Sequence, residues 1–499
     1  MPQNKKNSIW LAIQFVSSLI FSLITLKLNL LHFGEQIFGI WILMISFWGI
    51  STVVDLGFGT AIVKYIAGAN ANNDKDEINK IASTGFVIFF TLGIFLLAAG
   101  ILIALAIYYS NTNFIPKQYL SEFKAVFLFL GFSFYFQYLV VFFRSLFEGF
   151  NNFVITSKLT LIYNLLILFS VSIVFVLKLS IWTLALFYIL SSIILLLLYY
   201  FTLKQIFHSV QVNPGQFSFK YARRMFSFSF SVQIATFIGS SIDPVIKYVI
   251  GNYGSTSIIS YYEVARRFAL AISGLFNTAF KTILPRTSVL AKRSDFRDFI
   301  LNEGINYPKF GIVYSAIFYG ICSIFIVLII HFWFGFERSI IIFFILSLAE
   351  SVNNTGFMLY SFFTGIGKGL YLVIIQSSNI ILVILSLVAG FLIFGNQLGL
   401  IGYFVSVLLM NLLMVYLLNK QTGISIEQYL HKIHIYKLFM LLFFILLVII
   451  GNYVYSINVY LLSATLSLLC LFLFMRDIRQ YLSQLKGLFS FLKKIELKD

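Results

Sequence analysis

The sequence has little charge and few residues that interrupt helices. Only 11% of its 499 residues are charged and 60% are hydrophobic, whereas roughly 25% of residues are charged in soluble globular proteins. It contains six prolines, too few to divide long helices often. This composition excludes a soluble globular protein and indicates a bundle of long helices in lipid.

The residue patterns of common catalytic and metal sites are also missing. The two cysteines, Cys322 and Cys470, lie in apolar runs and lack the spacing of a disulfide framework or a metal site. The sequence has no glycine-rich phosphate loop, no His and Cys cluster at metal spacing, and no Ser/His/Asp set at one depth. We therefore expect no catalytic residue, no metal site and no cofactor, and we expect that the protein is not an enzyme.

Long apolar runs occupy most of the chain. A helix needs about 20 apolar residues to cross a bilayer, and the first run, 9–33, is too long for the apolar part of a signal peptide. The sequence therefore predicts an all-α integral membrane protein with about 14 transmembrane helices. The predicted spans are 8–33, 37–66, 81–109, 121–147, 159–178, 181–203, 225–250, 256–284, 304–330, 339–364, 370–394, 398–418, 437–455 and 458–476.

Positive charge is concentrated on one side of these spans. With the N-terminus inside, 27 of the 35 Lys and Arg residues fall in inner segments and six in outer segments. Because cytoplasmic loops are enriched in Lys and Arg, this bias predicts that both termini lie in the cytoplasm. The formal net charge of +17 is then a topology signal, and we expect no nucleic acid partner.

The chain has the pattern of two six-helix halves. The strongest shift in composition is the polar segment 204–224, and Ser145–Gly149 in the fourth span is echoed by Ser361–Gly365 in the tenth. Repeats of this kind are common in transporters. We expect an N-terminal lobe at 1–203, a cytoplasmic linker at 204–224, a C-terminal lobe at 225–418, and two extra helices with a basic tail at 419–499.

One stretch in the middle of the chain carries five ionisable side chains between long apolar runs. Asp243 and Lys247 are four residues apart, and Glu263 is three and four residues from Arg266 and Arg267, so each group shares a helix face. A charge inside a bilayer costs a few kcal/mol and usually has a function. The alternative is that these charges reach the membrane surface or pair with each other without a role.

The charges at membrane depth are mixed in sign. Guanidinium groups grip phosphate, and carboxylates and amides bind sugars, so the mixture suits a large anion that carries hydroxyl groups. We predict a polar cavity between helices. The candidate substrate-binding residues are Lys27, Asp243, Lys247, Glu263, Arg266, Arg267, Glu350 and Asn353.

A second group of residues is typical of helices that bend or pack closely. The segment Asp55-Leu-Gly-Phe-Gly59 contains two glycines, which permit close packing or bending. A proline frees a backbone carbonyl that a cavity tolerates better than lipid does. The candidate gating or packing residues are Asp55, Gly57, Gly59, Lys64 and Pro244.

Four short motifs resemble those of a known family. They are Phe38-Gly-Ile-Trp41, Asp55-Leu-Gly-Phe-Gly59 with Thr60 and Tyr65 after it, Asp243-Pro-Val-Ile-Lys247, and Tyr262-Glu-Val-Ala-Arg266. The chain resembles Wzx-type flippases for O-antigen and capsule repeat units, which belong to the multidrug/oligosaccharidyl-lipid/polysaccharide (MOP) exporter superfamily. The resemblance covers nearly all of the chain through loose motifs.

This resemblance implies a fold, a substrate and a set of partners. The fold would have two MATE-like lobes around a central cavity that opens alternately to each side of the bacterial cytoplasmic membrane. The substrate would be an undecaprenyl-diphosphate-linked oligosaccharide. Lys27, Arg266 and Arg267 would bind the diphosphate or acidic sugars, and Asp243, Lys247 and Glu263 would be gate or sugar contacts. Further implied partners are membrane lipid, a polysaccharide polymerase, a chain-length regulator and a coupling ion, H⁺ or Na⁺.

Two alternatives stay open at this point. The first is a lipid II flippase or a drug/cation antiporter of the same superfamily, although a cation-rich cavity argues against a cationic drug. The second is a membrane glycosyltransferase such as an O-antigen polymerase or ligase. Those enzymes generally have a large outer loop with arginines, and the longest predicted outer loop here is about 110–120.

Overall fold

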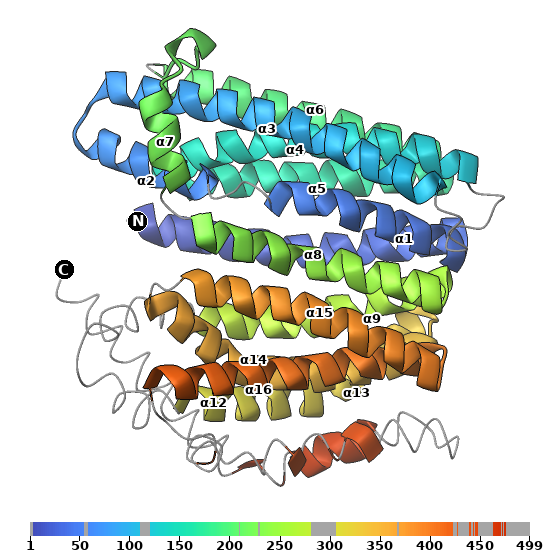
Figure 1. Cartoon of the computed structure of the whole chain (residues 1–499). Helices are drawn as coiled ribbons and strands as arrows, with labels where there is room; N and C mark the ends of the chain where they lie inside the picture. Colours follow the sequence, from blue (N-terminus) through green and yellow to red (C-terminus); the bar gives the residue numbers. More distant parts are fainter. Residues whose placement is uncertain are drawn as a thin grey trace. The chain divides into compact units, whose positions relative to one another are not determined.

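The protein is helical throughout its described part. The computed structural model describes residues 3–53, 58–109, 120–208, 210–227, 230–280, 306–366 and 369–422, with short stretches between 427 and 475. No strand occurs among these residues. The chain forms two compact units, Met1–Ser260 and Tyr261–Asp499, which we describe separately (Figure 1). The lobe boundary at 204–224 stays a prediction.

The helices follow the predicted apolar runs closely. The first unit contains α1 (Gln3–Val53), α2 (Phe58–Ala71), α3 (Lys75–Tyr109), α4 (Leu120–Gly149), α5 (Phe153–Val176), α6 (Ile181–Ile206), η2 (Pro214–Gln216), α7 (Phe219–Ser227), α8 (Phe230–Tyr253) and the start of α9 (Thr256–Phe280). The second unit continues α9 and contains α12 (Asn306–Ser315), η4 (Ala316–Ile321), α13 (Ser323–Leu328), η5 (Ile329–Phe334), α14 (Arg338–Ile366), α15 (Gly369–Phe394), η6 (Gln397–Leu400) and α16 (Ile401–Thr422).

Nine helices in the described part are long and apolar enough to cross a membrane, or ten if one bent pair counts as a span. One of the nine is the α1 stretch Ile9–Gly49, with 41 residues, which as a single rod would be about 60 Å long, twice the thickness of a hydrocarbon core. Gly34 interrupts it with φ of 71°, a value that glycine adopts readily, and the chain turns back there (Figure 1). The stretch therefore accounts for two predicted spans. The last two predicted spans lie largely outside the described residues.

Aromatic side chains fill the core of the first unit. Phe89 on α3 and Tyr138 on α4 are buried with ring centroids 5.0 Å apart. Phe147 on α4 and Tyr199 on α6 are buried with centroids 5.8 Å apart. Aromatic pairs at these separations are favourable beyond the area they bury. They hold α4 between α3 and α6.

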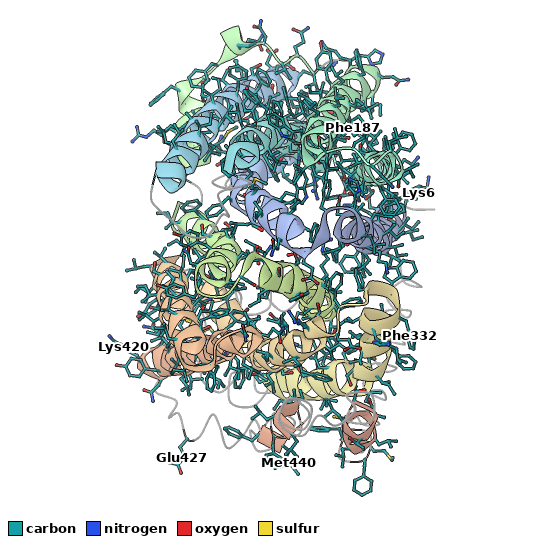
Figure 2. The ribbon with its side chains drawn as sticks, turned by 90° about the vertical axis from the view of Figure 1, so that its right-hand side faces the viewer. Lys6, Phe187, Phe332, Lys420, Glu427 and Met440 are labelled. Atoms are coloured by element: carbon teal, nitrogen blue, oxygen red, sulfur yellow. The ribbon has the colours of Figure 1, made fainter. Side chains whose placement is uncertain are left out.

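Large apolar side chains also cover the outer surface of the helices. Phe169 and Phe201 in the first unit and Phe332 in the second are mostly exposed, and Phe332 points outward in Figure 2. A soluble protein rarely exposes so much contiguous apolar surface. These side chains are placed to contact lipid acyl chains.

The second unit is built around α14. The stretch Arg338–Gly356 is almost entirely buried, and α14 packs against α12, α15 and α16. Between residues 306 and 334 the helical chain includes two π-helical turns, η4 and η5, and bends by 41° near Cys322. Such π turns interrupt the regular backbone hydrogen bonds and often occur at functional sites.

The polar linker after α6 is attached to the first turns of α3. The backbone N–H of Gln211 donates to Asn79 Oδ1 at 2.8 Å, and that of Asn213 donates to Ser83 Oγ at 3.0 Å. The N–H of Ser218 donates to the hydroxyl of Thr84 at 3.1 Å. The segment predicted as a plain linker is thus fixed in place and contains the short helix α7.

Candidate functional site

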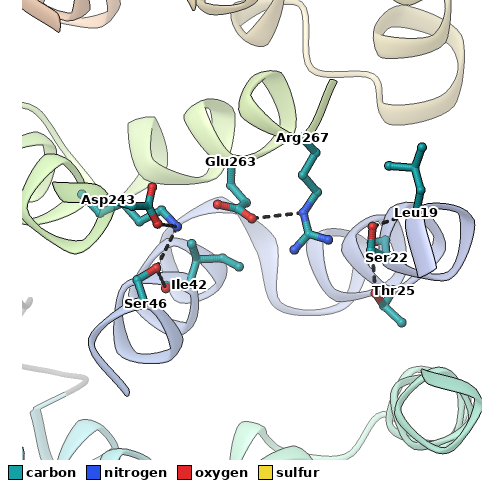
Figure 3. Close-up of polar contacts among 9 residues, drawn as sticks. Leu19, Ser22, Thr25, Ile42, Ser46, Asp243, Glu263 and Arg267 are labelled. Carbon is teal, nitrogen blue, oxygen red and sulfur yellow. Dashed lines mark hydrogen bonds and ion pairs between the residues drawn. The ribbon is translucent and has the colours of Figure 1, made fainter. Parts of the chain in front are cut away.

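An ion pair in the first unit joins α8 to α1. Lys247 Nζ lies 2.9 Å from Asp243 Oδ2 on the preceding turn of α8 and donates to Ser46 Oγ at 2.7 Å (Figure 3). The Lys247 side chain is only 4% exposed and that of Asp243 is 24% exposed. The two residues that share a helix face therefore form an ion pair, and their role in a cavity stays a prediction. Because Ser46 lies in the second segment of α1, Lys247 also connects two helices far apart in sequence.

The same segment of α1 contacts the first turns of α9 closely. A Cβ atom on Gly39 would lie 1.9 Å from the backbone carbonyl oxygen of Thr256, so only glycine fits there. The hydroxyl of Ser260 donates to the carbonyl of Glu35 at 2.6 Å, directly after the turn at Gly34. These contacts fix the α8–α9 connection against α1.

The remaining predicted residues of the first unit have different surroundings. Lys27 is half-buried on α1, and Gly59 is buried on α2. Lys64 is exposed, with Nζ 5.7 Å from the ring centroid of Tyr65. Pro244 is buried inside α8, which continues through it to Tyr253. Asp55 and Gly57 lie outside the described residues.

In the second unit, α9 carries a second ion pair. Arg267 Nε lies 3.0 Å from Glu263 Oε1, one turn away (Figure 3). The Glu263 side chain is 7% exposed and that of Arg267 is 26% exposed. Arg266 is half-buried on the neighbouring face and interacts electrostatically with Glu350. Both arginines of α9 therefore have a carboxylate within reach.

Glu350 lies in a buried polar cluster between α9, η4 and α14. Its Oε2 accepts hydrogen bonds from Ser273 Oγ at 2.8 Å and from the exposed Asn353 amide at 3.2 Å. The hydroxyls of Ser273 and Tyr319 are 2.8 Å apart, and that of Tyr319 also donates to a backbone carbonyl of α9. Asn354 is buried and completes the cluster. A carboxylate as buried as that of Glu350 requires such hydrogen-bond partners, because removing it from water without them is costly.

Sequence analysis missed Ser46, Ser273 and Tyr319. A weak signal existed for Ser273, which is seven residues after Arg266 and therefore lies on the same face of α9. Nothing in the sequence marks Tyr319, because its position depends on the π-helical turn η4. Ser46 is one of many serines in apolar spans, and only the fold shows which of them meets a cation.

The family of the chain follows from a direct match. The model of the polysaccharide biosynthesis protein family matches residues 5–290, more than half of the chain. The chain belongs to this family. No curated protein sequence matches it.

Solved structures show which fold this member of the polysaccharide biosynthesis protein family has. The lipid II flippase MurJ in an inward closed conformation matches with a TM-score of 0.59 at 16% identity, over 95% of this chain and 99% of that one. An inward-facing multidrug resistance MATE family transporter of the MOP superfamily matches with a TM-score of 0.57 at 11% identity, over 84% and 96%.

The Vibrio cholerae MATE transporter VcmN in its bent form matches with a TM-score of 0.54 at 11% identity, over 87% of this chain and 98% of that one. At these identities the likeness shows the fold alone. The prediction of an all-α membrane protein with a MATE-like fold is confirmed, while the count of 14 helices is not.

Proposed function

We propose that the protein is a flippase that moves undecaprenyl-diphosphate-linked oligosaccharide repeat units across the bacterial cytoplasmic membrane by alternating access. The product would serve O-antigen, capsule or exopolysaccharide synthesis. Membership of the polysaccharide biosynthesis protein family supports the pathway. The fold shared with MATE transporters and with a lipid II flippase supports the reaction type.

The observation that carries this proposal is the pair of arginines on α9. A diphosphate that crosses a hydrocarbon layer needs fixed positive charge, because an uncompensated anion there is very costly. Arg266 and Arg267 lie near the middle of α9, within the predicted span 256–284, and keep part of their surface exposed. A guanidinium group binds phosphate oxygens through two parallel N–H groups.

The carboxylates beside the arginines define how such a site would work. Glu263 holds Arg267 at 3.0 Å, and Glu350 interacts with Arg266, so both cations are compensated without substrate. A phosphate oxygen would replace or share a carboxylate contact, and the released carboxylate could accept a sugar hydroxyl. Binding would then exchange one ion pair for another. It would avoid exposing a bare charge in the membrane.

The test uses Arg266→Ala and Arg267→Ala in a strain that depends on the protein for export. We expect at least one variant to abolish surface polysaccharide and to accumulate lipid-linked repeat units on the cytoplasmic leaflet, at a normal protein level. Lysine at the sensitive position should restore export only partly, because it lacks the two-pronged grip on phosphate. Arg144→Ala is the matched control, since Arg144 pairs with Glu148 at a more exposed position.

Normal export by both alanine variants would refute the arginine-centred site.

The second candidate function is a lipid II flippase, favoured by the match to MurJ over 99% of that chain. It predicts that the protein restores growth of cells depleted of their lipid II flippase. Rescue there, without any effect on surface polysaccharide, would replace the first proposal with the second.

A further inference from the structure

The short helix α7 lies across the first unit. It contacts α2 and α3, and Figure 1 shows it crossing the ends of these helices instead of running along them. A helix that crosses the ends of membrane-spanning helices lies in the plane of the lipid headgroups. The predicted topology places this end in the cytoplasm.

The side chains of α7 are divided between two faces. Met225 is buried in the core of the first unit, and Tyr221 is half-buried next to α3. The exposed cations of this helix are Lys220, Arg223 and Arg224. Phe219, at its first position, is 75% exposed. Basic residues beside exposed aromatic residues are typical of helices that lie on an anionic membrane surface.

A polar cavity of about 400 Å³ lies between α7 and the start of α3. This volume is within the range of small-molecule sites, roughly 300–1,000 Å³. The cavity is lined by Asp76, Asn79, Lys80, Gln216, Phe217, Ser218, Lys220 and Tyr221. Its lining therefore combines two lysines, one carboxylate, amide and hydroxyl groups, and two aromatic rings.

Of the acidic residues around this cavity, Asp76 lines it and is exposed, whereas Glu77 and Asp74 have hydrogen-bond partners. Glu77 accepts a hydrogen bond from Tyr221 at 3.4 Å and lies 3.9 Å from Arg224, and Asp74 accepts the backbone N–H of Glu77. Burial and the Glu77 carboxylate raise the pKa of Tyr221, so its phenol stays neutral. Within the described residues, Lys80 and Lys220 form no ion pair.

We propose that this cavity binds the headgroup phosphate of an anionic phospholipid from the surrounding leaflet. Lys80 and Lys220 would contact the phosphate, and the amide and hydroxyl groups of the lining would bind the rest of a polar headgroup such as glycerol. Phe217 and Phe219, both exposed, would face the acyl chains. This site is separate from the arginines of α9 and does not depend on the proposed flippase activity.

The experiment measures lipid binding to the full-length protein in a neutral detergent. The protein is titrated with phosphatidylglycerol, phosphatidylcholine or inorganic phosphate, and bound lipid is counted by native mass spectrometry together with the shift in melting temperature. The variants are Lys80→Gln, Lys220→Gln and the double variant. Lys204→Gln is the matched control, because Lys204 is exposed in the last turn of α6 and lies outside the cavity.

We expect phosphatidylglycerol to bind more tightly than phosphatidylcholine. The double variant should bind phosphatidylglycerol about 30-fold more weakly, since each lysine near an anionic surface contributes a factor of about five. Lys204→Gln should bind as the wild type does. An unchanged melting temperature without lipid shows that the variants fold.

Three results would overturn the proposal. The first is equal affinity for phosphatidylglycerol and phosphatidylcholine. The second is an equal loss of phosphatidylglycerol affinity in the double variant and in the Lys204 control. The third is a shift in melting temperature with inorganic phosphate as large as that with phosphatidylglycerol at the same concentration. The last result would identify a site for free anions.

Discussion

Removal of one partner from the Asp243–Lys247 pair should destabilise the protein much more than removal of both. Asp243→Asn removes the carboxylate that lies 2.9 Å from the Lys247 ammonium, which is 4% exposed, while the hydrogen bond to Ser46 Oγ remains. Breaking a buried pair in this way costs about 3–5 kcal/mol. Because the Asp243 side chain is 24% exposed and its charge is partly screened by solvent, we expect Asp243→Asn to lower the free energy of unfolding by about 2–3 kcal/mol.

The double variant Asp243→Asn/Lys247→Met replaces both charges with groups of similar size. Such replacements are often close to neutral, so its free energy of unfolding should lie within about 1 kcal/mol of the wild type. The coupling energy from the double-mutant cycle is then about 2 kcal/mol. The measurement is chemical unfolding in bicelles, followed by tryptophan fluorescence.

The pair Arg144–Glu148 supplies the control. It has the same four-residue spacing and a 2.7 Å contact, and Arg144 is 47% exposed. Exposed helical pairs of this kind contribute about 0.3–0.5 kcal/mol. A coupling energy at Asp243–Lys247 no larger than that of the control pair would refute the reasoning from burial.

Three further predictions concern packing, the polar cluster and topology. Gly39→Ala should destabilise the protein by about 1–3 kcal/mol, because its Cβ would overlap a backbone carbonyl; Gly49→Ala, with nothing within 4 Å of its Cβ, should not. Tyr319→Phe should lower the free energy of unfolding by about 1–3 kcal/mol, measured by thermal unfolding, since it removes a buried hydroxyl that has two hydrogen-bond partners. Cysteines at Asn213 and Lys178 should react with impermeant reagents from opposite sides of the membrane, and labelling from one side would contradict the predicted topology.

The helices and the charged pairs within them could be predicted from the sequence. A run of apolar residues defines a span by its length, and a four-residue spacing fixes two side chains on one helix face. The spacing thus placed Asp243 beside Lys247, and both are paired in the structure; it placed Glu263 within reach of Arg266 and Arg267, and the structure pairs it with Arg267. Helix geometry alone determines these contacts.

Contacts between helices could not be predicted in the same way. Lys247 meets Ser46 from 201 residues away, and Ser273 meets Glu350 from 77 residues away. Those partners depend on how the helices pack, and the spacing of residues within one helix does not indicate which other helix packs against it. Likewise, α7 has only nine residues, too few to stand out from a polar linker by hydropathy.

The attachment of the linker to α3 has a consequence for biosynthesis. Asn79, Ser83 and Thr84 enter the membrane region with α3, whereas the backbone groups that they bind belong to Gln211, Asn213 and Ser218. The ribosome makes these later residues about 130 positions downstream. Until then the polar end of α3 stays open to water or to a chaperone, and the first six helices reach their final arrangement only after the segment that follows them has emerged.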